Sequence, residues 1–265
     1  MPKPQALVLV FPKEQCKKAP KIGSDEMQVH MIEDMASRGN PKIEITVAAY
    51  IEETENDGSE DRAKFFKYKD VNTTEASEIF PADGTGYYLC NHREEELHIR
   101  ATKAWTEIDE DFETKKYKGI IIPDAGEEAI GKMKTNTYLK NILTKHAKIG
   151  AFICAIGRSV KVLCHTGVYP GRTICIDTND TDVKEKAEPF CKYQIARCRN
   201  KGDANPQGKQ VTVDDTLITS AFSEDIFTFI KAALEGISGS NNCLSNLPTL
   251  QLAWKTILVY YLWGK

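Results

Sequence analysis

Several patterns that would assign a function at once are missing from this chain. Its eight cysteines form no Cys-x-x-Cys pair and no zinc-ligand spacing, and the sequence contains no internal repeat. In a chain of 265 residues this usage predicts mostly reduced thiols rather than a disulfide framework. A net charge of −3 and a pI near 6.0 give no electrostatic reason to expect a nucleic-acid partner. No residue pattern calls for a metal or an organic cofactor, so we expect neither.

Long apolar runs are also missing. The most apolar stretch, residues 250–263, is only fourteen residues long and contains Lys255, which is too short to cross a bilayer. We therefore expect no membrane span, and interpret residues 238–265 as a linker and an apolar tail that packs on the domain or in a dimer interface. Residues 1–5 lack the basic and then apolar layout of a signal peptide, so the predicted compartment is the cytoplasm.

Strand and helix patterns alternate along the rest of the chain. The predicted strands are residues 6–11, 43–47, 117–123, 149–153, 173–176, 211–213 and 217–220, and the predicted helices are residues 25–39, 127–133, 135–147, 158 onward and 223–236. This alternation predicts an α/β fold, with a mostly parallel sheet covered on both faces. Residues 1–237 are expected to form a single domain. It carries two long polar insertions, at about residues 51–114 and 179–210, where the alternation stops.

Residues 148–160, K-I-G-A-F-I-C-A-I-G-R-S-V, carry the most informative pattern. A short apolar run delivers Cys154 into a predicted turn before a helix. Such an elbow lifts a nucleophile above the carboxyl ends of a sheet, where the helix N-terminus favours a thiolate and backbone N–H groups can hold an oxyanion. The alternative is a structural cysteine buried at the end of a strand, because free cysteine is among the most buried residue types. The local pattern leaves both interpretations open.

Four segments, in this order, resemble the ThiJ/PfpI superfamily: Q-A-L-V-L-V-F, Y-K-G-I-I-I-P-D, G-A-F-I-C-A-I-G and V-D-D-T-L-I-T-S-A. Within it, I-C-A-I-G-R-S-V-K-V-L-C is most similar to the glutamine amidotransferase-like class 1 domain-containing proteins. The resemblance covers the first strand and most of residues 117–236. It implies a flavodoxin-like three-layer sandwich with a Cys nucleophile elbow, and it favours a homodimer. The family hosts several chemistries, so the resemblance is less specific for activity than for fold.

The resemblance also assigns roles to individual residues. It places Cys154 on the family's elbow nucleophile, with the backbone N–H of the next residue, Ala155, beside it. The oxyanion-side turn, usually Gly-Gly in the family, falls on Asp124 and Ala125, with Gly126 next to them. Loss of the first glycine restricts that turn, although its backbone N–H groups can still donate.

The family's carboxylate partner, a Glu near the start of the first helix, falls within D-E-M-Q. An ungapped match places Met27 there and a motif match places Gln28. Glu26 is the nearest carboxylate, and we predict it as the catalytic partner, although first-turn dipole compensation would also explain it. The family histidine that follows the elbow helix is missing. Asp177 is the only ionisable oxygen ligand in that region, and we predict that it or Glu26 orients the thiol or shuttles its proton. His165 lies eleven residues after Cys154, or roughly 16 Å along a helix, which is out of reach of the thiol.

Three functional hypotheses follow. The first is a family member with an elbow cysteine whose catalysis is weak or unestablished, in which the thiol is redox-sensitive or inert and the fold serves ligand binding or dimerisation. The second is a Cys-dependent enzyme of glyoxalase, deglycase or hydrolase type, which attacks a small-molecule carbonyl carbon through Cys154. The third, a glutaminase, loses support because the only H-x-E, at His92 to Glu94, precedes the cysteine. We favour the first over the second because the missing histidine removes general-base help.

Overall fold

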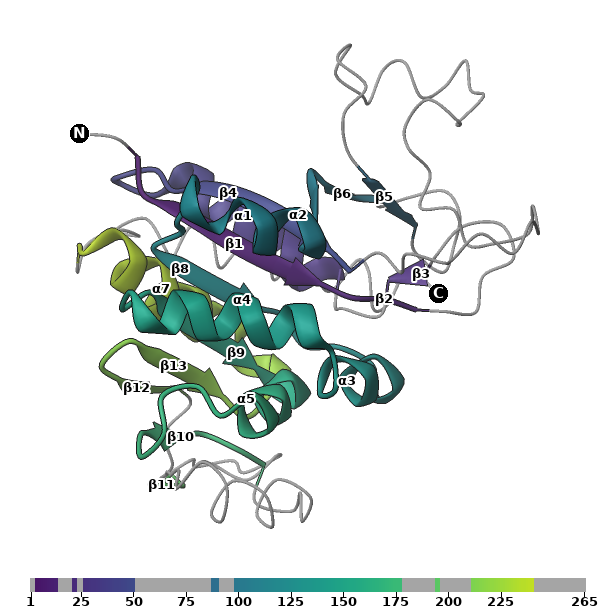
Figure 1. Ribbon diagram of the computed structural model, residues 1–265. Helices are drawn as coiled ribbons and strands as arrows, with labels where there is room; N and C mark the ends of the chain where they lie inside the picture. The colour runs from purple at the N-terminus through teal and green to yellow at the C-terminus, as the bar shows by residue number, and fades with distance from the viewer. Residues whose placement is uncertain are drawn as a thin grey trace, which may run out of the picture.

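A seven-stranded sheet runs through the protein, and all but one pair of its neighbouring strands are parallel (Figure 1). The computed structural model describes residues 3–13, 21–22, 26–50, 87–90, 98–177, 194–195 and 211–240. In spatial order the strands are β12 (Thr212–Asp214), β13 (Leu217–Ser220), β9 (Phe152–Ile156), β8 (Gly119–Ile122), β1 (Gln5–Val10), β4 (Glu44–Ala49) and β7 (Lys103–Ala104). Only β12 runs antiparallel, in a hairpin with β13. The predicted mostly parallel α/β fold is confirmed.

Helices cover both faces of this sheet. One layer holds α1 (Glu26–Arg38) and α7 (Ile226–Ser238), and the other holds α2 (Trp105–Glu110), α3 (Glu127–Met133), α4 (Thr137–Lys148) and α5 (Val160–Thr166). Short 3₁₀ turns precede or follow three of these helices: η3 (Asp111–Glu113), η4 (Gly157–Ser159) and η5 (Ser223–Asp225). Two apolar clusters fill the space between the sheet and the two layers.

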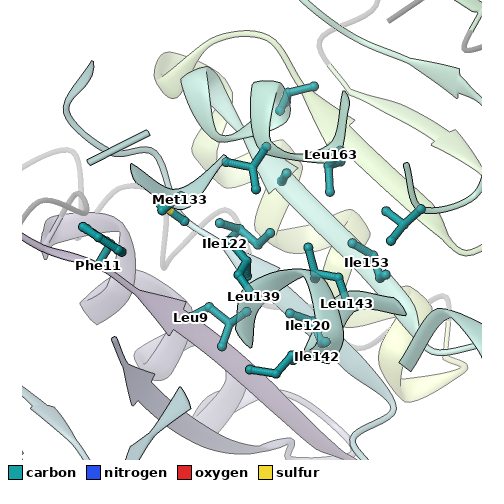
Figure 2. Packing of buried hydrophobic residues seen from close by; sticks show 14 of the residues in the cluster. Leu9, Phe11, Ile120, Ile122, Met133, Leu139, Ile142, Leu143, Ile153 and Leu163 are labelled. Carbon is teal, nitrogen blue, oxygen red and sulfur yellow. The ribbon is translucent and has the colours of Figure 1, made fainter. Parts of the chain in front are cut away.

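Burial on both faces explains the continuous apolar run of β1, in which every residue from Ala6 to Val10 is fully buried. The helices instead bury one stripe each. In α4, Leu139, Ile142, Leu143 and His146 recur at helical spacing and face the sheet. Figure 2 shows part of the resulting cluster, with residues of α4 packed against residues of β1, β8 and β9.

Smaller sheets lie beside the main one. A four-stranded sheet is formed by β2 (Pro12–Lys13), β3 (Lys21–Ile22), β5 (Tyr87–Cys90) and β6 (His98–Ala101), and a two-stranded one by β10 (Thr173–Ile174) and β11 (Gln194–Ile195). None of the helices within the described ranges is both long enough and apolar enough to span a bilayer.

The first predicted insertion, residues 51–114, extends too far at its C-terminal end. Strand β7 closes one edge of the main sheet, and α2 follows it directly. Trp105 of α2 is fully buried, and its indole N–H donates to the Ala48 carbonyl at 2.9 Å. A two-residue strand is too short to produce a readable alternation, which is why the sequence pattern missed it. Most of residues 51–97, 179–210 and 241–265 lies outside the described residues.

The cysteines are in different states. Cys154 and Cys164 are free and buried, whereas Cys175 is disulfide-bonded. The sequence predicted mostly reduced thiols, and one bonded cysteine does not contradict that prediction.

His146 is a fully buried titratable group of the core. Its Nδ1–H donates to the Ile142 carbonyl at 2.8 Å, and its ring packs between Phe112 and Tyr117, with centroid distances of 4.9 and 5.9 Å. Burial lowers the pKa of this imidazole below its usual value, and the neighbouring Lys145 ammonium acts in the same direction, while the bond to Ile142 opposes them. Folding therefore favours the neutral form of His146.

We expect this burial to make the free energy of unfolding fall as the pH drops below about 6.5. Below that value the unfolded chain takes up a proton on His146 that the folded protein resists, so the contribution is fully present above the unfolded pKa. Urea unfolding at pH 7.5 and pH 5.5 measures it. His146→Leu should show a flatter pH dependence than the wild type, whereas the control His165→Gln, on a partly exposed residue of α5, should retain the wild-type slope. Equal slopes for wild type and His146→Leu would contradict this account.

Candidate functional site at the carboxyl edge of the sheet

The chain order of the strands locates a crevice between β1 and β8. From β1 the chain first builds outward on one side through β4 and β7, and then returns to the other side through β8, β9 and β13. In open α/β sheets, ligands bind at such a switch point, outside the carboxyl ends of the strands. The candidate site is therefore the edge where β8 and β9 end and where α1 begins after β1.

The sharp turn after β9 is formed by Gly157 and not by Cys154. Strand β9 continues through Ile156, and Gly157 then adopts a φ of +64°, a left-handed conformation that favours glycine. The hydroxyl of Ser159, which is fully buried, donates to the carbonyl of Pro123 and ties the turn to the end of β8. The predicted strand, turn and helix are present, but the prediction that a thiol sits at the turn is wrong.

Cys154 lies inside the strand, roughly 10 Å before the turn. It pairs with Ile121 of β8 and Ile218 of β13, and its side chain is fully buried in the cluster beneath α1 and α7. Burial raises the pKa of the Cys154 thiol far above its usual value, and among the described residues no charged or hydrogen-bonding group counteracts this effect. Neither thiolate formation nor access to a substrate is favoured here.

At the end of β8, the carboxylate of Asp124 accepts hydrogen bonds from several groups of the site. Its Oδ1 accepts from the backbone N–H of Ala125 at 2.9 Å and from the backbone N–H of Arg158 at 2.9 Å. The Arg158 guanidinium donates to the two carboxylate oxygens at 3.3 and 3.4 Å, and the Ser223 hydroxyl donates to Oδ2 at 2.5 Å. Asp124 is only 7% exposed, so these bonds compensate for the burial of its charge.

The carboxylate of Asp124 lies in the space beside Gly157 where a Cβ would point. A Cβ placed on Gly157 would lie 2.6 Å from Cγ of Asp124 and 2.8 Å from each of its carboxylate oxygens. These distances are shorter than van der Waals contact. The carboxylate therefore occupies the space that a side chain at the turn would need, and a nucleophile at position 157 is incompatible with this arrangement.

From α1, the side chain of Gln28 reaches the end of β8. Its Oε1 accepts from the backbone N–H of Asp124 at 2.8 Å, and the residue is 3% exposed. Gln28 is the residue that the motif match placed at the family's carboxylate position. The side chain of Glu26 lies outside the described residues, so its catalytic role stays a prediction. Gln28 is a neutral amide, whereas the resemblance implied a carboxylate. Its side chain therefore cannot act as a general base at this site.

The other predicted site residues are dispersed. Ala155 lies inside β9, paired with Ile122 and Thr219, so it is not at the turn. Gly126 is the N-cap of α3. Asp177 is partly exposed beyond β10, and it does not contribute to the raised pKa of Cys154. Of the predicted oxyanion-side N–H groups, that of Asp124 donates to Gln28 and that of Ala125 donates to the Asp124 carboxylate.

Arg158 and Ser223 were missed by the sequence reasoning. One signal for the contact with Arg158 was present in the sequence. Arg158 directly follows Gly157, and Asp124 replaces the first glycine of the family's oxyanion-side turn, so the two turns carry opposite charges. Within the described ranges, no group of three or more His, Cys, Asp or Glu side chains is arranged to hold a metal ion.

A cavity of about 320 Å³ opens at the same edge of the sheet, where β1 and β4 end. The rings of Phe11 and Tyr50 are stacked there, with centroids 5.1 Å apart and nearly parallel planes. The remaining lining residues come from the α3–α4 connection: Lys132, Thr135, Asn136, Thr137 and Tyr138. A larger cavity of about 410 Å³ lies at the opposite edge, beside Phe152 and Gly236. The smaller cavity is the stronger candidate for a ligand site, because ligands of this fold class bind at the carboxyl edge of the sheet.

A model of the DJ-1/PfpI family matches residues 42–236, well over half of the chain. The chain belongs to the DJ-1/PfpI family. The resemblance noted in the sequence is thus confirmed at the level of family and fold. No curated protein matches the sequence.

Solved DJ-1 structures share the fold of this DJ-1/PfpI protein but little of its sequence. Drosophila melanogaster DJ-1beta superposes with a TM-score of 0.61 at 17% identity, covering 94% of this chain and 98% of that one. An oxidized form of Toxoplasma gondii DJ-1 gives 0.57 at 17% identity, with 94% and 97% covered. Schizosaccharomyces pombe DJ-1 gives 0.58 at 15% identity, with 92% and 97% covered. At such identities the likeness shows the fold alone.

Proposed function

We propose that this DJ-1/PfpI family member acts by binding a small molecule without forming a covalent bond to a thiol. One observation carries the proposal: Gly157 occupies the turn, and the Asp124 carboxylate fills the space beside it. A covalent mechanism needs an accessible nucleophile next to free oxyanion donors. Here the N–H groups of Ala125 and Arg158 already donate to Asp124.

The location of the thiol supports the same proposal. Cys154 is buried within the sheet, and burial raises its pKa, so the reactive thiolate is disfavoured. The Cys-dependent glyoxalase, deglycase or hydrolase reaction on a carbonyl carbon would require the thiol to leave the cluster that surrounds it. We therefore propose that Cys154 is a core residue, neither a nucleophile nor a readily oxidised sensor.

The cavity lined by Phe11 and Tyr50 supports the binding half of the proposal. Its stacked rings offer an apolar face, while Lys132 and the polar residues of the α3–α4 connection line the remainder. A cavity that combines an aromatic face with several polar groups can hold and orient a small molecule that has both apolar and polar parts. The volume of this cavity, about 320 Å³, lies at the lower end of the range for small-molecule sites. A homodimer and a cytoplasmic location remain predictions from the resemblance and the sequence.

Turnover assays test the proposal directly. With methylglyoxal and p-nitrophenyl acetate as probes, we expect Cys154→Ala to show the same rate as the wild type, within about twofold of the uncatalysed background. Circular dichroism and urea unfolding of both proteins establish that the variant is folded. Turnover that is well above background and is lost in a folded Cys154→Ala protein would overturn the proposal in favour of the Cys-dependent enzyme.

A further inference from the structure

The hydrogen-bond donors at the elbow converge on one point. Two backbone N–H groups, from Ala125 and Arg158, the hydroxyl of Ser223 and the guanidinium of Arg158 all donate to the carboxylate of Asp124. We infer that these donors form an anion-binding site with the size of one carboxylate group, and that the chain fills this site with its own Asp124 side chain.

The donors match a carboxylate in number and in direction. Both oxygens are engaged: Oδ1 by the two N–H groups and by Nε of Arg158, and Oδ2 by Ser223 and by Nη2 of Arg158. The guanidinium contacts, at 3.3 and 3.4 Å, are long for charge-assisted bonds, so Arg158 contributes mainly its positive charge and the backbone N–H groups and Ser223 contribute the shorter bonds. Without the Asp124 side chain, these donors would be left around an empty volume beside a single positive charge.

The backbone around this volume is held independently of the Asp124 carboxylate. The N–H of Asp124 is bound by Gln28, and the turn that carries Arg158 is tied to Pro123 through Ser159. Gly157 leaves the volume open, because it has no Cβ to enter it. The site should therefore keep its shape when Asp124 is shortened, and a free carboxylate of the smallest size, formate, should enter it.

In the native protein the tethered Asp124 excludes such ligands, because an intramolecular group acts at a high effective concentration. The ligand class is thus a small carboxylate, and the Asp124 side chain competes with it for the same hydrogen-bond donors. This inference stands on the hydrogen bonds around Asp124 and not on the proposed function, and its test uses no catalytic readout.

The experiment compares thermal unfolding of wild type and Asp124→Gly in sodium formate and in sodium chloride at equal ionic strength. At formate concentrations of ten or more times the dissociation constant, formate should raise the Tm of Asp124→Gly by about 3–8 °C relative to chloride, because a ligand that binds only the folded state stabilises it. The wild type should show no such difference. Line broadening of ¹³C-formate in NMR spectra, present with Asp124→Gly and absent with wild type, gives a second readout of binding.

Three variants make the assignment specific. Asp124→Asn fills the same volume with a neutral group, so its Tm should not respond to formate. Adding Arg158→Gln to Asp124→Gly removes the positive charge, and adding Gly157→Ala places a methyl group in the volume; both should abolish the formate response. If Asp124→Gly does not fold in chloride, it should fold when refolded in formate.

Four results would overturn the inference. These are a folded Asp124→Gly without a formate response, an equal response in wild type, a response that survives Arg158→Gln, and failure to fold in either salt.

Discussion

In the folded protein, iodoacetamide is expected to alkylate Cys154 at least about 10³-fold more slowly than in the unfolded chain. The thiol is fully buried in the centre of β9, so the reagent reaches it only when the sheet opens. Burial also raises its pKa, which lowers the thiolate fraction at neutral pH. Mass spectrometry of peptides labelled at pH 7 to 9, with and without urea, separates Cys154 from the other thiols.

The same protein in urea is the matched control, because it reports the intrinsic reactivity of this thiol. Rapid labelling of native protein, with a midpoint below the ordinary thiol value of about 8.5, would show an activated thiolate and contradict the assignment of Cys154 to the core. Slow labelling also changes how substitutions are interpreted. Cys154→Ser buries a hydroxyl and should cost about 1–3 kcal/mol of stability, so Cys154→Ala is the better variant for activity measurements.

Replacing Gly157 with alanine is expected to reduce the free energy of unfolding by about 2–4 kcal/mol. One part of this cost is conformational, because a φ of +64° is unfavourable for a residue with a Cβ. The other part is steric, because that Cβ would lie 2.6 Å from Cγ of Asp124, a side chain held by the bonds from Ala125, Arg158 and Ser223. Urea unfolding at pH 7.5 measures the total.

Gly150 provides the matched control for the conformational part. It also has a positive φ, +74°, but a Cβ built on it meets nothing within 4 Å. Gly150→Ala should therefore cost only the backbone strain, about 1–2 kcal/mol. If the two substitutions cost the same, the crowding between residues 157 and 124 would be absent and the description of the turn would be wrong.

The fold was predictable from the sequence because local patterns determine it. Continuous apolar runs mark the strands buried on both faces, and the stripe of Leu139, Ile142, Leu143 and His146 marks α4. The elbow was displaced by three residues because Ala155 and Ile156 are compatible with either a strand or a turn. Only the positive φ requirement distinguishes them, and Gly157 is the residue that meets it without strain.

The site was less predictable because its contacts join distant parts of the chain. Asp124 meets Arg158 across 34 positions, Gln28 across 96 and Ser223 across 99. No periodicity within one element reports such contacts. The family resemblance located the two turns, but it implied a nucleophile and free oxyanion donors, whereas this chain has a glycine and an occupied set of donors.

A double-mutant cycle between Gly157 and Asp124 tests the central claim most directly. Urea unfolding of wild type, Gly157→Ala, Asp124→Gly and the double variant gives the interaction free energy between the two positions. We predict that Gly157→Ala costs about 1–3 kcal/mol less in the Asp124→Gly background, because the added methyl group then enters an empty volume. Additive costs, within about 0.5 kcal/mol, would show that the Asp124 carboxylate does not occupy the space beside the turn, and would contradict the account.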